Sequence, residues 1–230
     1  MSAPALASHG TELLDDPDAD PAVVVRSLAN IARANRWFGG RAAALWGIDR
    51  LLDGLPPGQP VSLLDLGTGA GDLPAAAIRR ARQRGRVLTA IGLERSHAAA
   101  SLAAARRLPV VLGCAGQLPV RPRGVDVVLI SQLAHHLAPD ATVELFGAAS
   151  TLARVGVVVA DLRRSELAVA AFRLGSALLR FDPVTREDGI TSVRRGYEAQ
   201  ELRALVRRAG YEARVSRRPG FRLVATWSTR

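Results

Sequence analysis

The sequence predicts an α/β protein whose doubly wound, mostly parallel sheet follows a helical N-terminal part. From Val61 onward, short apolar runs of strand length alternate with longer segments of helical periodicity. Such alternation is typical of parallel strands that are covered by helices on both faces. The chain of 230 residues, 48% of them hydrophobic, is long enough for one sizeable core and fits one domain better than two.

Two helices are expected before the sheet. Asp20 and Pro21 combine a capping acid with a proline in the first helical position, and Gly39 with Gly40 ends that helix. A second amphipathic helix stops at Gly54, just before a Pro-Pro-Gly breaker. The residues before the first helix are acidic and lack periodicity, so we expect 1–20 to be a disordered acidic leader.

Seven strands are expected in the sheet. The first five follow the alternating pattern, and the C-terminal part supplies a closing pair. We place the strands near 61–66, 87–93, 109–113, 125–131, 155–161, 211–217 and 221–228. Helices are placed near 72–84, 96–107, 140–153, 163–180 and 198–209, and 182–196 is expected to be an irregular loop because it is rich in Asp, Gly and Arg.

Composition argues against several classes of protein. The net charge is +10, and every basic residue is an arginine. This pattern indicates a general composition bias more than a nucleic-acid surface, so nucleic acid is not the expected partner. No apolar stretch is long enough to span a membrane, and no membrane partner is expected. The single cysteine, Cys114, cannot form an intrachain disulfide, and a reducing cytoplasm is the expected location.

The most informative segment is the glycine-rich turn after the first expected strand, Asp65-Leu-Gly67-Thr-Gly69-Ala-Gly71. Glycines at alternate positions let a ligand approach the backbone, and the N-terminus of the next helix faces that ligand. The dinucleotide spacing fails because its third glycine would fall on Asp72 or Pro74, and the lysine of a P-loop is missing. A ligand of nucleoside type with a zwitterionic tail fits best.

This turn resembles the first motif of the class I S-adenosylmethionine-dependent methyltransferases. The resemblance implies a Rossmann-like methyltransferase fold, with S-adenosylmethionine as cofactor and S-adenosylhomocysteine as product. It also implies that Asp65 holds the amino-acid end of the cofactor, that Glu94 accepts hydrogen bonds from the ribose hydroxyls, and that Arg95 packs on the adenine. A nicotinamide or other nucleotide fold of the same topology is the alternative. The cofactor-binding residues expected are Asp65, Gly67, Thr68, Gly69, Gly71, Glu94, Arg95, Cys114, Ala115 and Ser131.

The block from Gly113 to Pro119 is similar to a family element whose acid bonds the adenine amino group. Cys114 stands where that acid would be. Because a thiol is a weak acceptor, we expect backbone groups of Cys114 and Ala115 to contact the adenine. The cysteine side chain is expected to be buried as a small hydrophobic group.

A His-His-Leu triplet follows the fourth expected strand. It resembles the triplet that small-molecule methyltransferases, including those of quinone biosynthesis, place beside the transferred methyl group. Histidine suits proton removal near neutral pH, so His135 and His136 are the candidate catalytic residues. Alternatively, one ring caps the following helix or forms part of the pocket wall.

The acceptor side carries a weaker resemblance, to methyltransferases that act beside plant-type polyketide synthases on phenolic products. It rests on Asn35-Arg-Trp-Phe-Gly-Gly40, on the end of the fifth expected strand and on the Asp-Gly-Ile-Thr segment after 187. In that arrangement the N-terminal helices close over the cofactor and exclude water. The candidate substrate-binding residues are Trp37, Phe38, Asp161, Arg164 and Arg194.

These observations predict one methyltransferase domain over 21–230, with a helical cap at 21–54, a cofactor-binding core at 61–161 and acceptor-side elements at 162–230. The leading hypothesis is O-methylation of a small phenolic, hydroxyquinone or polyketide acceptor with histidine-assisted deprotonation, as part of secondary metabolism. C-methylation, RNA methylation and a non-catalytic cofactor-binding protein are the alternatives. No metal is expected, because grouped carboxylates near the third and fourth strand ends are lacking. A homodimer is left open.

Overall fold

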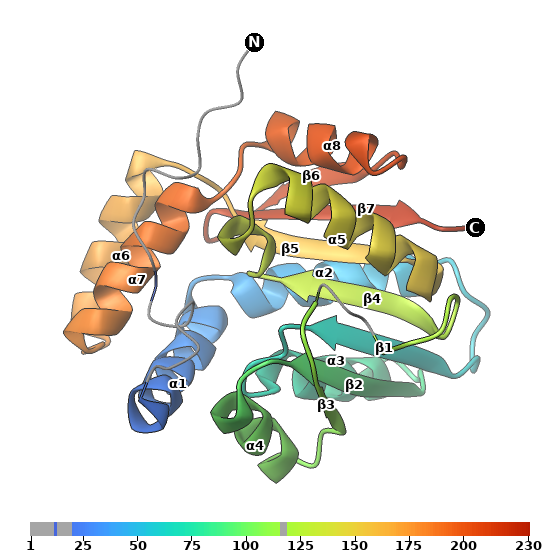
Figure 1. Cartoon of the computed structure of the whole chain (residues 1–230), viewed down its shortest axis with the longest axis horizontal. Coiled ribbons are helices and arrows are strands. Elements are labelled where there is room, and N and C mark those ends of the chain that lie inside the picture. Colours follow the sequence, from blue (N-terminus) through green and yellow to red (C-terminus); the bar gives the residue numbers. More distant parts are fainter. Residues whose placement is uncertain (1–11, 13–19, 116–118) are drawn as a thin grey trace.

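A seven-stranded sheet organises the chain, and the expected α/β architecture is confirmed (Figure 1). The computed structural model describes residue 12 and residues 20–115 and 119–230. The strand order is β3-β2-β1-β4-β5-β7-β6, with β1 to β5 parallel and β7 antiparallel to both of its neighbours. The strands are β1 Val61–Leu66, β2 Leu88–Glu94, β3 Val110–Leu112, β4 Val125–Ser131, β5 Ala153–Leu162, β6 Arg214–Arg218 and β7 Arg222–Ser228.

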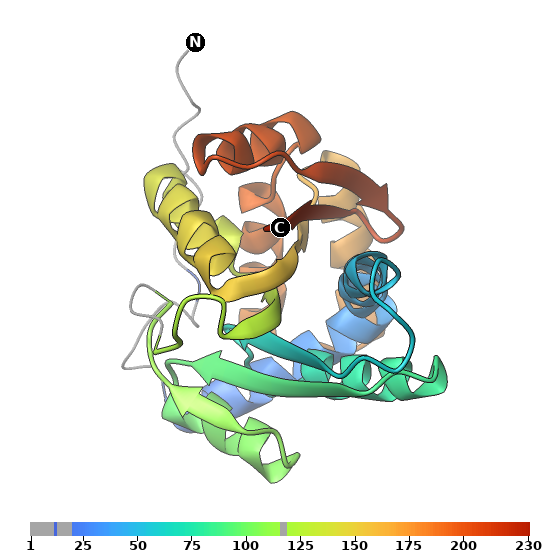
Figure 2. The same cartoon turned by 90° about the vertical axis from the view of Figure 1, so that its right-hand side faces the viewer.

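Eight α-helices and a short 3-10 turn surround the sheet in the described part of the chain. Side chains along β4 alternate between two apolar cores, because successive residues of a strand point to opposite faces. Val128 and Ile130 pack with α5 and α8, whereas Val127 and Leu129 pack with α2 and α3. Figure 2 shows α5 and α2 on opposite sides of the sheet. The helices are α1 Pro21–Trp37, α2 Gly40–Leu52, α3 Asp72–Gln83, α4 His97–Ala105, η3 Ala134–His136, α5 Pro139–Leu152, α6 Glu166–Leu178, α7 Pro183–Arg195 and α8 Ala199–Arg208.

The two helices expected as a cap have different positions. Buried residues of α2 form part of the core beneath the sheet, so this helix is one of those that cover a face. Helix α1 instead lies beyond the carboxyl ends of the strands, in contact with α4 and α7. Gly39, between the two helices, has a φ of 79°, and a Cβ there would lie 2.4 Å from the carbonyl oxygen of Pro219. The turn between α1 and α2 therefore approaches the β6–β7 hairpin closely.

The expectation of an irregular loop at 182–196 is wrong, because residues 183–195 form helix α7. Asp182 is its N-cap and accepts a hydrogen bond from the backbone N–H of Thr185 at 3.0 Å, and Pro183 follows in the first helical position. Gly189 lets the ring of Phe172 on α6 pack against α7, since a Cβ would lie 2.2 Å from that ring. Interhelical packing thus outweighs the poor helix propensity of the Asp and Gly residues.

No helix among the described residues is both long enough and apolar enough to cross a membrane. The expected leader, apart from Glu12 and Asp20, lies outside the described residues.

We expect Asp182→Ala to lower the free energy of unfolding by about 1–2 kcal/mol, the usual cost of losing an N-cap. Asp182 also accepts hydrogen bonds from the Thr185 hydroxyl and from the Asn30 side chain, so its loss weakens the contact between α7 and α1 as well. Urea denaturation of the variant beside Glu187→Ala, an exposed acid on the same helix, measures the effect. Equal stability of the two variants would contradict the assignment of this cap.

Candidate active site

A cavity of about 1140 Å³ lies at the carboxyl ends of the parallel strands. Its lining comes from the loops after β1, β2 and β4, from the start of β7, and from α1, α6 and α7. Because β1 and β4 lead into helices on opposite faces of the sheet, the cavity opens at the switch point where α/β proteins bind ligands. Sequence motifs that are far apart in the chain therefore face one space.

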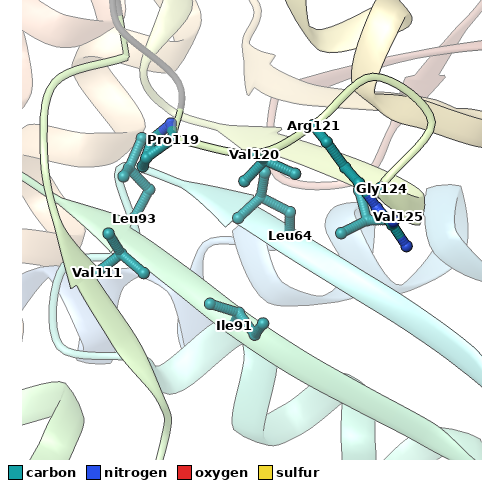
Figure 3. A pocket seen from close by; sticks show the side chains of 9 residues that line it. All are labelled: Leu64, Ile91, Leu93, Val111, Pro119, Val120, Arg121, Gly124 and Val125. Carbon is teal, nitrogen blue, oxygen red and sulfur yellow. The ribbon is translucent and has the colours of Figure 1, made fainter.

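A second, smaller hollow of about 280 Å³ lies against the face of β1 and β2 that carries Leu64, Ile91 and Leu93. Figure 3 shows Pro119 and Val120 over Leu93 and Leu64, and Arg121 is the one titratable residue of its described lining. The described part of its lining offers no cluster of polar groups. The larger cavity is therefore the candidate active site.

The glycine turn after β1 takes the shape expected of it. Gly67, Gly69 and Gly71 have φ values of 72°, 55° and 72°, in the left-handed region that favours glycine. A Cβ on Gly71 would also lie 3.0 Å from Leu108. The turn leads directly into α3, whose N-terminal backbone N–H groups lie beside the cavity.

Asp65 offers an unpaired acceptor in this cavity. The side chain is 1% exposed, and its Oδ2 accepts a hydrogen bond from the Thr68 hydroxyl at 2.8 Å. Its Oδ1 is buried and has no hydrogen-bond partner in the described structure. Burial raises the pKa of Asp65 to about 7, helped by the negative charges of Asp72 and Glu94 and opposed by the Thr68 hydrogen bond. An ammonium group in the cavity would satisfy Oδ1 and favour the ionised carboxylate.

Glu94 ends β2 with its carboxylate held by backbone donors. Oε2 accepts from the N–H of Gly69 at 2.8 Å, and Oε1 accepts from Arg95 and Ser96 at 2.8 and 2.9 Å. These bonds fix the carboxylate beside the glycine turn at the cavity wall. Among the described residues, Oε2 has this one donor, so it keeps a lone pair for a ligand hydroxyl.

The expectation of a buried Cys114 side chain is wrong, because this residue is exposed. β3 is a three-residue strand at the edge of the sheet, so the chain that leaves it is not covered by a neighbouring strand. Cys114 and Ala115 line the cavity together with Arg95, which is also exposed. Gln117 and Leu118 of the same motif lie outside the described residues.

His135 and Asp161 form a buried pair. His135 Nδ1 lies 2.6 Å from Asp161 Oδ1, and the two residues are 3% and 0% exposed. Burial acts to raise the pKa of Asp161, but the charge and hydrogen bond of His135 and the N–H of Leu162 outweigh it and hold the pKa below its usual value. His135 lines the cavity, and its Nε2 has no hydrogen-bond partner among the described residues.

His136 lies against His135 and faces Glu12. The two rings have centroids 4.2 Å apart, and His136 Nε2 is 3.8 Å from Glu12 Oε2. One ligand atom from each of Glu12, His135 and His136 lies within 4.8 Å of the others, a grouping that could hold a metal ion. The Glu12 carboxylate also accepts hydrogen bonds from Ser192 at 2.7 Å and Arg195 at 3.2 Å, so part of its charge is already balanced.

The five expected acceptor residues are not brought together. Trp37 and Phe38 line the cavity, and the Phe38 ring contacts Phe172 edge to face with centroids 5.5 Å apart. The expectations for Asp161, Arg164 and Arg194 need correction, because none of the three lines the cavity. Asp161 is buried and bonded to His135, and Arg164 donates to the Gly196 carbonyl and to Glu201. Arg194 is exposed outside the lining. Arg194 lies on the exposed side of α7, and Arg164 is bonded to Glu201 of α8.

Some polar residues of the lining were not predicted. Asn35, Gln132 and Arg222 form a hydrogen-bonded chain along the wall. Asn35 begins the Asn-Arg-Trp-Phe-Gly-Gly segment that carried the weaker resemblance, but the three residues lie in different parts of the fold, and no pattern in the sequence links them.

The chain is similar in fold to solved methyltransferases. A putative O-methyltransferase from Nostoc punctiforme PCC 73102 aligns with a TM-score of 0.63 at 17% identity, over 96% of this chain and 64% of that one. A SAM dependent methyltransferase from Aquifex aeolicus gives 0.61 at 14% identity, over 92% and 99%. Magnesium protoporphyrin IX methyltransferase from Synechocystis PCC 6803, with bound SAH, gives 0.58 at 15%, over 85% of each.

These similarities show that the chain has the Rossmann-like fold of class I methyltransferases. No protein-family model matches it, and no curated protein matches its sequence. At these identities the similarity establishes the fold, whereas the chemistry depends on the residues of the site.

Glu94→Ala should weaken binding of S-adenosylhomocysteine by at least about tenfold, because it removes the charged group that we expect to accept hydrogen bonds from the ribose hydroxyls. Calorimetry measures the affinity, with Glu144→Ala, an exposed acid on α5, as the matched control. Glu94→Gln, which keeps acceptor capacity for the glycine turn, should give an intermediate loss. Unchanged affinity in a folded Glu94→Ala protein would exclude this site for the ribose.

Affinity for S-adenosylhomocysteine should rise with pH around neutrality. Below about pH 7 the Asp65 carboxyl is largely protonated and cannot pair with the ammonium group of the ligand, whereas above it the carboxylate can. Titrations at several pH values between about 6 and 8 measure this change. Asp65→Asn should bind more weakly and remove the pH dependence, and an equally steep dependence in that variant would contradict the role of Asp65.

Proposed function

We propose that this protein is a methyltransferase that transfers a methyl group from S-adenosylmethionine to the oxygen of a small phenolic, hydroxyquinone or polyketide acceptor. The observation that carries the proposal is the His135–Asp161 pair: His135 lines the same cavity as the glycine turn, Asp65 and Glu94, and its Nε2 has no hydrogen-bond partner among the described residues. A base and a nucleoside-type site in one cavity are the two requirements of this reaction.

The cofactor half of the cavity fits S-adenosylmethionine. The orphaned Asp65 Oδ1 suits its ammonium group, Glu94 suits the ribose hydroxyls, and the glycine turn admits the ligand to within contact of the backbone. The hydrogen bond from the Thr68 hydroxyl orients Asp65, and Ser131, at the end of β4, also lines the cavity. When bound, the cofactor supplies an electrophilic methyl group, so the protein has to orient the acceptor and take its proton.

His135 is the proposed proton acceptor. Asp161 is ionised and accepts the hydrogen bond from Nδ1–H, which leaves the Nε2 lone pair available for the proton of an acceptor. When the acceptor hydroxyl gives its proton to Nε2, the imidazolium that forms is stabilised by the buried Asp161 carboxylate. An unperturbed phenol has a pKa near 10, so moderate assistance from a histidine is enough for its ionisation.

The acceptor half of the cavity is aromatic. Phe38, Phe172 and Phe181 pack edge to face with centroid distances of 5.5, 6.4 and 6.5 Å, and Trp37 is 64% exposed beside them. A flat aromatic acceptor would stack or meet these rings favourably. The cavity also exceeds the roughly 300–1,000 Å³ of a typical single-ligand pocket, which leaves room for cofactor and acceptor together.

The same cavity and base also suit methylation of an activated ring carbon, which remains the second candidate. Both reactions begin with loss of the same hydroxyl proton. Fragmentation of the product by mass spectrometry, which locates the methyl group on oxygen or carbon, decides between them.

His135→Asn should lower kcat by about 10²–10⁴, the usual contribution of a positioned general base, with affinity for S-adenosylhomocysteine unchanged. The loss should shrink for nitrophenol acceptors, which ionise without help. His136→Asn should retain most of kcat if His135 alone is the base. A loss in His135→Asn that is equal for acidic and weakly acidic phenols would identify His135 as a wall residue instead.

Asp161→Asn should also reduce kcat, because the amide no longer fixes the tautomer or stabilises the imidazolium. Its matched control is Asp53→Asn, which changes an exposed carboxylate that pairs with Arg84. An Asp161→Asn variant with normal kcat would refute its positioning role.

A further inference from the structure

The cavity contains a buried arginine that the proposed reaction does not use. Arg222, the first residue of β7, lines the cavity and is 5% exposed. No carboxylate of the described chain lies within ion-pair distance of its guanidinium. Buried arginines are rare in proteins unless an anion pairs with them. Arg222 therefore lacks the directly paired anion that a buried arginine usually has.

Two of the three guanidinium nitrogens are already engaged. Nε donates to the carbonyl oxygen of Phe38 at 3.1 Å, and Nη1 donates to Oε1 of Gln132 at 3.0 Å. Gln132 is itself held by a hydrogen bond from its Nε2 to the Asn35 side chain. These bonds fix the plane of the guanidinium. They leave Nη2 without a hydrogen-bond partner in the described part of the chain.

Arg222 keeps its charge at neutral pH. Burial lowers its pKa to about 10, and the negative charge of Asp161 acts in the opposite direction. Asp161 is the charged group that faces Arg222; its Oδ1 accepts from His135 and from the N–H of Leu162, and its Oδ2 has no hydrogen-bond partner among the described residues. It offers Arg222 a favourable field without a direct bond.

The position of Arg222 connects the proposed base with the aromatic wall. Its neighbour across the sheet is Leu162, which directly follows Asp161 of the His135 pair. Its Nε bond reaches Phe38, whose ring belongs to the aromatic group. A ligand that lies between Phe38 and His135 is thus within the field of this cation.

We propose that Arg222 binds a carboxylate or another ionised oxygen of a ligand in this cavity through its free Nη2. The proposal deepens the proposed function and rests on it for the identity of the ligand. On the acceptor, the anionic oxygen would be a second group beside the hydroxyl that is methylated. On the cofactor, it would be the carboxylate of the amino-acid end. Guanidinium is well matched to either, because it donates in a fixed plane and stays charged.

A purely structural role is the alternative. The Nε bond joins the turn after α1 to the β6–β7 hairpin, where a Cβ on Gly220 would lie 2.3 Å from the Phe38 carbonyl oxygen. That role needs Nε alone and predicts no preference for charged ligands. The two readings therefore differ in how substitution affects charged and neutral ligands of the same shape.

The experiment measures binding of two matched probe pairs to the wild-type protein and to Arg222→Gln. The acceptor pair is salicylate and salicylamide, added to protein saturated with S-adenosylhomocysteine. The cofactor pair is S-adenosylhomocysteine and its decarboxylated analogue, which keeps the amine. Arg217→Gln, an exposed arginine on β6, is the control for the loss of one positive charge, and thermal unfolding checks that each variant is folded.

We expect Arg222→Gln to weaken one carboxylate probe by at least about tenfold and its neutral counterpart by less than about twofold. Loss confined to salicylate assigns the anion to the acceptor, and loss confined to S-adenosylhomocysteine assigns it to the cofactor. Equal effects on the charged and neutral members of both pairs would overturn the proposal. The Arg217→Gln control should leave all four affinities unchanged.

If Arg222→Gln does not fold, the wild-type protein decides the question. At least one carboxylate probe must then bind at least about tenfold more tightly than its neutral counterpart, and the absence of any such preference would overturn the proposal. Failure of the proposed function has a different signature, because it would appear as absent binding of S-adenosylhomocysteine and of its decarboxylated analogue alike.

Discussion

The hydrogen bond between His135 and Asp161 is the contact on which the organisation of the site depends. Asp161 is fully buried, and hydrogen bonds from His135 and from the N–H of Leu162 to its Oδ1 stabilise its ionised form there. The two residues come together because β4 and β5 are parallel neighbours, with Ser131 paired to Ala160. Loss of either partner would leave the other buried and unsatisfied, which is costly in a closed interior.

The strand order sets the division of the cavity into two halves. The ends of β1 and β2 present Asp65, the glycine turn and Glu94 to one half, whereas the ends of β4 and β5 and the start of β7 present His135 and Arg222 to the other. β1 and β4 are adjacent in the sheet, so a nucleoside-type ligand and an acceptor would meet above their boundary. This placement explains how residues more than 150 positions apart, such as Asp65 and Arg222, can line one cavity.

Helices α1, α6 and α7 complete the acceptor half, and their contacts depend on aromatic rings set against small residues. Phe172 packs on Gly189, and Phe38 packs on Gly175, where a Cβ would lie 2.5 Å from the ring. The region 182–196 was predicted as a loop because Asp and Gly lower helix propensity, and that local signal cannot report interhelical packing. The same limit explains Arg164 and Arg194, whose direction depends on where α7 and α8 lie.

The sequence by itself determined the strand-turn-helix around Gly67, Gly69 and Gly71, because positive φ and a clear approach to the backbone are local demands that only glycine meets easily. It also indicated Glu94 and the histidine pair through their places at strand ends. Only the tertiary structure decided that Asp161 supports His135, that Cys114 is exposed and that Arg222 lies buried in the same cavity. Partners of that kind are set by strand order and helix packing, which bring together residues with no common pattern in the chain.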